Sequence, residues 1–318
     1  MSVIRERGRD PFQDARHIAA YRFAHELAMK HFHWDDAKRC WYIRKSEGEP
    51  RWYLGDSPNQ CWRNTLSALD VGCGPGYGAA YLQNEFGYDV LGIDPDERAI
   101  RSASKLDSFA EFKMCPDWTL GLMSHEDFDI VTCFQVIEHR KDYLRLIIEC
   151  WKHTAPGGLL FITTPKSRLE PGEKPWNIEH VQEWGLLGMY DLKKLLTGKV
   201  IGNAPVIHAV VGIVTSPSVA TWLAPDEILL YGIQAGGSAW EYEQSRILAA
   251  KKKARLDPLR LRRFLPDVWR YRLSDWITPF VGGVDERFPK EYLDKTFILK
   301  NAEAPTVLDF MLVLKKGV

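Results

Sequence analysis

The sequence feature that most constrains the fold is a glycine-rich turn placed directly after a short apolar segment. Residues 67–71 are mostly apolar with an acid near the end, and glycines then occupy every second position from 72 to 78. The pattern predicts a buried strand over 67–71 and a helix over 79–86. Because glycine adopts φ > 0 and has no Cβ, such a turn lets the backbone lie very close to a ligand. We therefore expect a ligand site at this junction, with Asp70 facing it.

A second segment further along the chain repeats this pattern. Val90 to Asp94 again combines apolar residues with a final acid, about twenty residues after the glycines. In doubly wound sheets, this position carries the carboxylate that binds a ribose. An acid at position 94 therefore indicates that the ligand contains a nucleoside.

Predicted strands and helices alternate from residue 67 onward. The strands lie near 67–71, 88–93, 109–115, 127–134 and 157–163, and the helices near 79–86, 96–106 and 140–153. Such alternation implies a parallel α/β sheet with helices on both faces. Further elements are a helix near 185–197, a strand near 205–214 and a strongly apolar final strand over Val307–Lys315.

The chain divides into four predicted parts. They are an N-terminal helical cover (1–65, with a helix over 11–33 and an irregular segment over 41–64), the sheet core (66–215), an insertion or lid subdomain (216–300) and the last core strand (301–318). The insertion is assigned because residues 216–300 do not fit the strand–helix repeat of the core.

Charge and hydropathy argue against several classes of function. The chain has 42 Lys+Arg and 42 Asp+Glu, so no net field draws it to nucleic acid or to a membrane. Its longest apolar run, 204–214, is far shorter than the ~20 residues of a spanning helix. The charged N-terminus lacks the apolar segment of a signal peptide. The six cysteines form no CxxC pair, which predicts buried, reduced thiols and a cytoplasmic location.

The glycine turn by itself fits two classes of cofactor. Gly74, Gly76 and Ala79 match the relaxed fingerprint GxGxxG/A of dinucleotide-binding proteins. Asp70, however, places an acid beside the turn. A pyrophosphate gains little from a neighbouring carboxylate, whereas the amino group or sulfonium of S-adenosylmethionine would be stabilised by one.

Five sequence blocks in order resemble the class I S-adenosylmethionine-dependent methyltransferases, particularly the branch of ubiquinone-pathway O-methyltransferases and natural-product tailoring enzymes. The blocks cover about residues 66–166: Leu69-Asp70-Val71-Gly72-Cys73-Gly74-Pro75-Gly76, Gly92-Ile93-Asp94-Pro95, Phe128-Asp129-Ile130-Val131 through Val136-Ile137-Glu138-His139, Pro156-Gly157-Gly158-Leu159-Leu160 and Thr163-Thr164-Pro165-Lys166. The resemblance implies a Rossmann-like sheet of seven strands, the first six parallel and the last, Val307–Lys315, inserted antiparallel.

The resemblance also implies which residues bind S-adenosylmethionine and release S-adenosylhomocysteine. The methionine part would contact Asp70, Gly72, Cys73, Gly74 and Gly76. Asp94 would accept from the ribose hydroxyls, Pro95 would shape the following loop, and Phe134 and Gln135 would lie beside the methyl donor. Asp117 and Trp118 would meet the adenine; the alternative is that they are an Asp turn and a packed ring. Tyr21, in Tyr21-Arg22-Phe23-Ala24, resembles part of the helix that closes over the cofactor, and we predict that it meets the substrate.

Two Glu-His pairs are candidates for the chemistry of the acceptor. Methyl transfer from a sulfonium is an in-line displacement helped mainly by alignment and desolvation, yet a hydroxyl nucleophile benefits from a base near neutral pKa. His139 follows the fourth predicted strand and could act as base or substrate ligand, with Glu138 orienting it; the alternative is that the pair only caps the loop. His180, beside Glu179, and Trp184 follow the fifth strand and are predicted to line the substrate pocket.

We predict no metal site. Related methyltransferases that act on the 3′ ends of small RNAs use Glu-x-x-Glu-His and later histidines to hold a metal. Here the first position is Gln135, and a single later histidine stands at a comparable place.

The sequence leaves the methyl acceptor open. The favoured function is methyl transfer to a hydroxyl or amine of a small metabolite. A basic stretch over 251–272 keeps RNA or another phosphate-bearing substrate as an alternative, although such runs are more often solvated helix faces. A catalytically silent cofactor-binding partner is a third hypothesis, and a nicotinamide-dependent enzyme is the least favoured.

Overall fold

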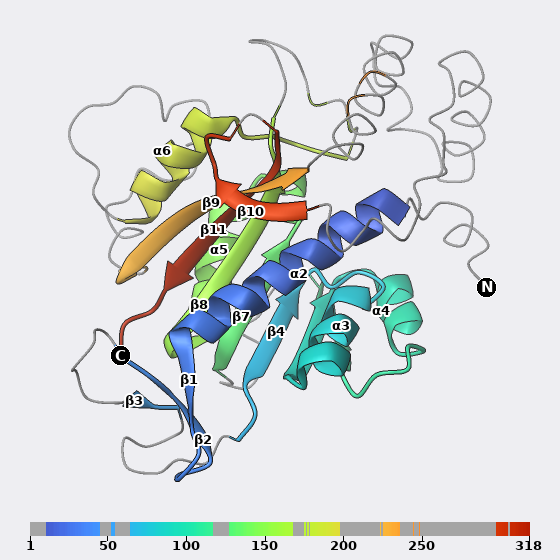
Figure 1. Cartoon of the computed structure of the whole chain (residues 1–318). Helices are drawn as coiled ribbons and strands as arrows, with labels where there is room; N and C mark the ends of the chain where they lie inside the picture. The colour runs from blue at the N-terminus through green and yellow to red at the C-terminus, as the bar shows by residue number, and fades with distance from the viewer. Residues whose placement is uncertain are drawn as a thin grey trace.

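Among the residues that the structure describes, eight strands form the central sheet, in the order β10-β9-β11-β8-β7-β4-β5-β6 (Figure 1). The computed structural model describes residues 11–44, 52–54, 64–116, 127–167, 175, 177, 179–197, 223, 225–235, 244, 248, 297–304 and 306–318. The strands are β4 (Ser67–Val71), β5 (Asp89–Asp94), β6 (Glu111–Met114), β7 (Phe128–Phe134), β8 (Thr154–Pro165), β9 (Glu227–Ala235), β10 (Phe297–Asn301) and β11 (Val307–Lys315).

Strand directions confirm the predicted Rossmann-like sheet. The strands β4 to β8 pair in parallel, and β11 lies antiparallel between β8 and β9. Because β9 is antiparallel to β11, it runs in the same direction as β4 to β8, which gives six strands of one direction and an inserted last strand. The sheet has an eighth strand, β10, where we predicted seven. This short strand pairs with β9 at the sheet edge, and its sequence FILKN has no alternation that would have predicted it.

The sixth core strand is β9, which lies within the segment 216–300 that we predicted to be an insertion. The strand that we predicted at 205–214 lies outside the described residues. Residues 227–235 are largely apolar, but we included them in the insertion because the long segment around them breaks the core repeat. The sheet therefore takes β9 and most of β10 from the segment 216–300. The division of the chain into domains stays a prediction.

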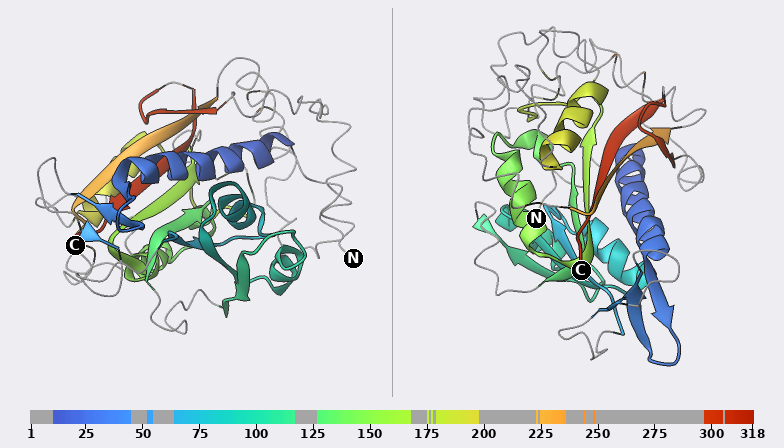
Figure 2. Two further views of the ribbon diagram at one scale, coloured as in Figure 1. Left: turned by 60° about the horizontal axis from the view of Figure 1, so that its bottom comes forward. Right: turned by 90° about the vertical axis from the view of Figure 1, so that its left-hand side faces the viewer.

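Helices cover both faces of the sheet (Figure 2). The helices are α2 (Pro11–His31), α3 (Tyr77–Phe86), α4 (Glu97–Ala103), α5 (Tyr143–Lys152) and α6 (Leu186–Leu196). Side chains of β7 alternate between two hydrophobic clusters: Ile130 and Phe134 pack with α2 and α3, whereas Val131 and Cys133 pack with α5 and α6. This period of two explains why all seven residues of β7 are buried.

The N-terminal part combines α2 with a small antiparallel sheet of β1 (Phe32–Asp35), β2 (Cys40–Ile43) and β3 (Trp52–Tyr53). We expected an irregular segment over 41–64, and β2 and β3 correct this. The turn before β2 is set by the Asp35 carboxylate, which accepts from the backbone N–H groups of Ala37 and Lys38 at 3.1 Å. That local capping lets the two strands pair.

The cysteines differ in part from the expectation of reduced thiols. Cys40 is disulfide-bonded, which contradicts the prediction for that residue. The thiols of Cys73, Cys115, Cys133 and Cys150 are free and buried, as predicted. Within the part of the chain that the structure describes, no helix is both long and apolar enough to cross a membrane.

A buried ion pair joins α2 to the last strand. The guanidinium of Arg16 makes two short hydrogen bonds to the Asp309 carboxylate and a third, of 3.3 Å, to the Leu308 carbonyl. Both side chains are almost fully buried. The pair therefore fixes the first described helix to a strand 293 residues away in sequence.

We expect Arg16→Met to lower the free energy of unfolding by about 3–5 kcal/mol, because it leaves the Asp309 carboxylate buried without its cation. Arg101→Met is the matched control: Arg101 pairs with Glu97 on the exposed face of α4, so its loss should cost only about 0.3–0.5 kcal/mol. Urea unfolding measures both. Equal stability of the two variants would contradict a structural role for the Arg16–Asp309 pair.

Candidate functional site

The candidate site lies at the carboxyl ends of the parallel strands, where the order of the sheet reverses. The chain adds β5 and β6 on one side of β4, and then β7 and β8 on the other. In open α/β sheets, ligands bind outside the carboxyl ends at this switch point. Asp70, the glycine turn, Asp94, Phe134 and Gln135 all lie at the ends of β4, β5 and β7, as the sequence predicted.

The glycine turn has the backbone conformation that its sequence requires. Gly72, Gly74 and Gly76 have φ of 78°, 55° and 85°, which side chains rarely adopt. The backbone N–H groups of Gly72 and Cys73 donate to the Ile93 carbonyl at 2.8 and 3.0 Å, so the turn is held against β5. A Cβ on Gly74 would have no atom within 4 Å, which leaves room for a ligand beside the turn.

Asp70 is fully buried at the end of β4. Its carboxylate accepts from the Thr132 hydroxyl at 2.7 Å and from the Tyr21 hydroxyl at 3.0 and 3.1 Å. Burial raises the pKa of Asp70 to about 6, although both hydrogen bonds oppose the rise. Asp70 is thus an acid that ionises just below neutral pH and that a cationic group nearby would stabilise.

Tyr21 of α2 lies against these residues. Its ring centroid is 4.7 Å from that of Phe134, and a Cβ on Gly78 would come within 2.0 Å of the Tyr21 ring. The fourth glycine therefore makes space for this tyrosine. The sequence predicted Tyr21 as a substrate residue, and the structure adds its contact with Asp70, which sequence reasoning did not identify.

Asp94 holds the glycine turn from the end of β5. Its carboxylate accepts from the backbone N–H of Gly74 at 2.9 Å and from that of Asp96 at 2.8 Å. Pro95 forms the bend that follows the strand. A carboxylate has about four acceptor positions, so the partly exposed Asp94 can bind the turn and also a ribose. Asp117 and Trp118 lie outside the described residues.

Gln135, directly after β7, adopts the left-handed region with φ of 57°. Its backbone N–H donates to the Thr163 carbonyl at 3.1 Å, and its side-chain amide lies 3.3 Å from Thr163 Oγ1 and from Asp309 Oδ1. A non-glycine residue held in this conformation costs about 1–3 kcal/mol and is typical of functional sites. The contacts with β8 and β11 stabilise it here.

Glu138 is buried in the short 3-10 helix η3 (Ile137–His139) that follows β7. Its Oε2 atom accepts from the Thr164 hydroxyl at 3.3 Å, whereas its buried Oε1 atom has no hydrogen-bond partner. Burial raises the pKa of Glu138 to about 8. Such an orphaned carboxylate oxygen is costly in a folded protein.

The structure brings His139 and His180 together beside Glu138. The two imidazole rings meet edge to face with centroids 4.8 Å apart. His139 Nε2 lies 4.0 Å from Glu138 Oε1, and burial together with the nearby His180 lowers the pKa of His139. The sequence placed these residues in two separate sites. The signal that could have joined them is that both Glu-His pairs follow the carboxyl ends of adjacent parallel strands.

Trp184 lies in the hydrophobic core, with its ring 5.1 Å from that of Tyr143. It is 7% exposed, so the role that the structure shows for Trp184 is packing. Its contact with a substrate stays a prediction. Sequence reasoning missed the residues whose side chains support the site through hydrogen bonds or ion pairs, namely Arg16, Thr132, Thr164, Glu183 and Asp309.

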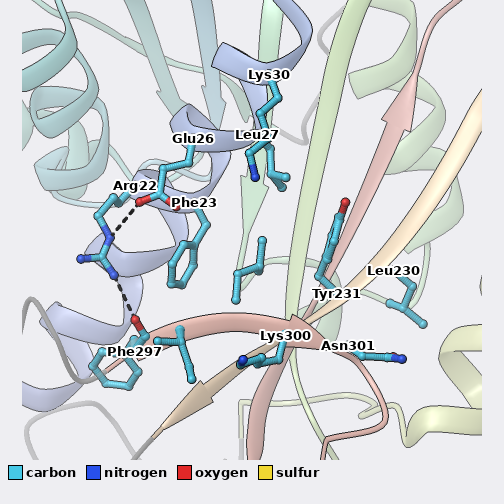
Figure 3. Close-up of a pocket in the computed structure, with 12 residues that line it drawn as sticks. Arg22, Phe23, Glu26, Leu27, Lys30, Leu230, Tyr231, Phe297, Lys300 and Asn301 are labelled. Atoms are coloured by element: carbon cyan, nitrogen blue, oxygen red, sulfur yellow. Dashed lines mark hydrogen bonds and ion pairs between the residues drawn. The ribbon is translucent and has the colours of Figure 1, made fainter.

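A separate cavity of about 1030 Å³ lies between α2 and the strands β9 and β10 (Figure 3). Arg22 spans its rim, donating to the Phe297 carbonyl at 3.0 Å and lying 3.6 Å from Glu26. Tyr231 and Lys300 line it from the strands. The cavity shares no lining residue with the Glu138, His139 and His180 cluster, and the sequence did not predict it.

Taken together, the fold and the site define a class I S-adenosylmethionine-dependent methyltransferase architecture. A family model described as a methyltransferase domain matches residues 16–197, more than half of the chain. The chain therefore belongs to this methyltransferase family. The predicted family and its cofactor class are confirmed.

Individual relatives are similar over parts of their length. A probable S-adenosylmethionine-dependent methyltransferase of Mycolicibacterium smegmatis is 29% identical over 44% of this chain and 54% of its own. A ubiquinone biosynthesis O-methyltransferase of Pseudomonas fluorescens is 29% identical over 52% of this chain and 76% of its own. The plantazolicin methyltransferase BpumL in complex with SAH is 16% identical, with a TM-score of 0.46, over 96% of this chain and 85% of that one. The chain spans about half the length of several curated relatives, such as the 54% above and 43% of a Psychrobacter cryohalolentis ubiquinone biosynthesis O-methyltransferase.

We expect Asp70→Asn to change how stability depends on pH. The pKa of Asp70 is 3.8 in the unfolded chain and about 6 in the folded protein. Between pH 4 and 6, the folded protein therefore holds a proton on Asp70 that the unfolded chain loses. The contribution of Asp70 to the wild-type free energy of unfolding therefore falls by about 3 kcal/mol as pH rises through this window. Relative to wild type, the variant should gain stability over the window and level off above it.

Urea unfolding of the ligand-free protein at a series of pH values measures this difference. Asp107→Asn, at an exposed aspartate, controls for the loss of a carboxylate. A constant difference between Asp70→Asn and wild type from pH 4 to 7 would show that Asp70 does not titrate in this range.

Proposed function

We propose that this chain transfers a methyl group from S-adenosylmethionine to a hydroxyl group of a small-molecule acceptor. The observation that carries the proposal is the cluster of Glu138, His139 and His180 at the same sheet edge as the glycine turn, Asp70 and Asp94. Several relatives are named as O-methyltransferases, which favours oxygen over nitrogen as the acceptor atom.

The residues around the glycine turn fit the proposed cofactor. Asp70 provides a buried carboxylate for the amino group, and the open space beside Gly74 lets a ligand approach the backbone. Asp94 would provide acceptors for ribose hydroxyls, and Phe134 and Gln135 would meet the methyl donor. Asp117 and Trp118 remain the predicted adenine contacts. When bound, S-adenosylmethionine supplies an electrophilic methyl group on a sulfonium and leaves as S-adenosylhomocysteine.

The Glu138, His139 and His180 cluster prepares the acceptor. His139 Nδ1 bonds to the Glu179 carbonyl at 3.1 Å. Because a carbonyl can only accept, Nδ1 carries the hydrogen and Nε2 presents a basic lone pair. The lowered pKa of His139 keeps this lone pair available at neutral pH. Glu138 Oε1 lies 4.0 Å from His139 Nε2, so Glu138 in its ionised form would stabilise positive charge on the ring. His180 would bind the acceptor.

We expect Asp94→Asn to weaken the binding of S-adenosylhomocysteine by about 10- to 100-fold, because hydrogen bonds to a charged group contribute about 1.5–3 kcal/mol. Isothermal titration calorimetry measures the affinity. Asp89→Asn is the matched control, since Asp89 is exposed at the opposite end of the same strand. Wild-type affinity in Asp94→Asn, or binding of NAD instead, would contradict the cofactor assignment.

We expect His139→Ala to lower methyl transfer by about 10²- to 10⁴-fold, the usual contribution of a positioned acid or base, while S-adenosylhomocysteine affinity stays unchanged. A panel of phenols, catechols, alcohols and amines with a labelled methyl donor measures transfer. His25→Gln is the control, since His25 stacks on Phe86 at the C-terminal end of α3, whereas the glycine turn precedes the N-terminal end of this helix. Full turnover in His139→Ala would remove His139 from the chemistry.

Two other hypotheses are outcomes of the same panel. The basic stretch over 251–272, which motivates an RNA substrate, lies outside the described residues. Tight cofactor binding without transfer to any acceptor would instead favour a catalytically silent binding protein.

A further inference from the structure

Two cavities adjoin on the face of the sheet that α2 covers. The larger, of about 1030 Å³, is the one between α2, β9 and β10, and a smaller one of about 290 Å³ lies beside it, over β8, β9 and β11. Leu27, Lys30 and Tyr231 line both, so the cavities form one groove, the α2 groove. We propose that the α2 groove binds a single-chain amphiphile, with its anionic head group in the smaller cavity and its apolar chain in the larger one. The inference goes beyond the proposed function, because no lining residue belongs to the proposed methyl-transfer site.

The smaller cavity is strongly basic. Of its ten described lining residues five are basic and none is acidic, the basic ones being Lys30, His31, His33, Arg44 and Lys315. This excess is local, because the chain as a whole has equal numbers of basic and acidic residues. A concave surface lined by one sign of charge attracts the opposite charge, so the smaller cavity favours an anion.

Lys30 and Arg44 supply the positive charge that the protein itself does not compensate. Neither forms an ion pair in the part of the chain that the structure describes, and the Nε atom of Arg44 is buried without a hydrogen-bond partner. Lys315, in contrast, is paired with Glu227. A buried N–H group without an acceptor is costly. An anionic oxygen bound here would accept from Arg44, and carboxylate and phosphate groups match a guanidinium in this way.

The larger cavity supplies apolar surface for a chain. Its apolar lining side chains come from α2 and from the strands: Phe23, Leu27, Leu230, Phe297, Ile298 and Leu299. Arg22, at the rim, is already paired with Glu26 at 3.6 Å. Lys30 from α2 and Tyr231 from β9 extend into the space between helix and sheet (Figure 3), where the two cavities meet. The groove therefore changes from basic to apolar along its length, which matches an amphiphile better than an inorganic anion.

The head-group end of the groove lies far from the methyl-transfer edge of the sheet. Lys315 pairs in register with Leu159, and both line the smaller cavity, whereas Asp309 pairs with Pro165 at the carboxyl ends of the parallel strands. Six residues along a strand span about 20 Å. The anionic group would thus bind at the opposite ends of the strands from Asp70 and Glu138, so the groove is a second site.

The test is isothermal titration calorimetry of the full chain with dodecanoate, kept below the concentration at which it forms micelles. We expect one saturable site, with an affinity that rises about fourfold for each methylene from octanoate to dodecanoate, as burial of the chain requires. Dodecanol, which lacks the charge, and acetate, which lacks the chain, should each bind at least about tenfold more weakly.

Variants test the head-group cavity directly. Lys30→Met and Arg44→Met should each weaken dodecanoate binding by about 10- to 100-fold, because each removes a hydrogen bond between charged groups. Lys152→Met is the matched control, since Lys152 is an exposed lysine of α5, on the other face of the sheet, and should bind as wild type. Circular dichroism checks that each variant is folded.

Weaker binding in at least one of the two groove variants, with wild-type binding in Lys152→Met, would support the proposal. Absence of saturable binding, equal affinity for dodecanol and dodecanoate, or binding that neither groove variant changes would overturn it. Each of these failures leaves the proposed function intact, because methyl transfer is assigned to residues outside the α2 groove.

Discussion

The structure depends on how three carboxylates buried at one edge of the sheet are compensated. Asp309 pairs with Arg16, and Asp70 accepts hydrogen bonds from Tyr21 and Thr132. Since Arg16 and Tyr21 both belong to α2, two of the three carboxylates hold the N-terminal helix over the cofactor end of the sheet. A buried charge that loses its partner costs several kcal/mol, so the helix and this edge stabilise each other. Glu138 is the third carboxylate, and one of its oxygens has no such partner.

The order of the strands explains why these carboxylates meet. Asp70 lies near the carboxyl end of β4, and Glu138 follows the carboxyl end of β7. Because β11 runs antiparallel, its beginning lies beside the end of β8, and Asp309 pairs in register with Pro165. Inserting the last strand in this direction therefore brings an acid from near the C-terminus to the edge that residues 70 to 139 build. The side-chain amide of Gln135 lies 3.3 Å from the carboxylate of the same acid, which links the end of β7 to β11.

Local patterns were sufficient to predict the parts of the site that one segment builds. The glycine turn, Asp70 and Asp94 follow from spacing, because left-handed glycines and an acid at a strand end are typical of the ligand-binding edge of a doubly wound sheet. The strand Val307–Lys315 was predicted to the residue from its apolar run. Short strands that are held by pairing alone, such as β3 and β10, were missed. Two to five residues are too few to show the alternation of apolar and polar residues that predicts a strand. β9 was missed as a core strand because the long segment around it breaks the strand–helix repeat of the core.

The sequence by itself determined the fold class, the conformation of the glycine turn and the family, since these depend on contacts within a few dozen residues. Only the tertiary structure decided what distant segments do together. It paired Arg16 with Asp309, placed Tyr21 on Asp70, and joined His139 to His180 beside an oxygen of Glu138 that has no partner. Apart from the two Glu-His pairs at the ends of adjacent strands, these contacts have no sequence signal, because each depends on strand order and on how charge is compensated after burial.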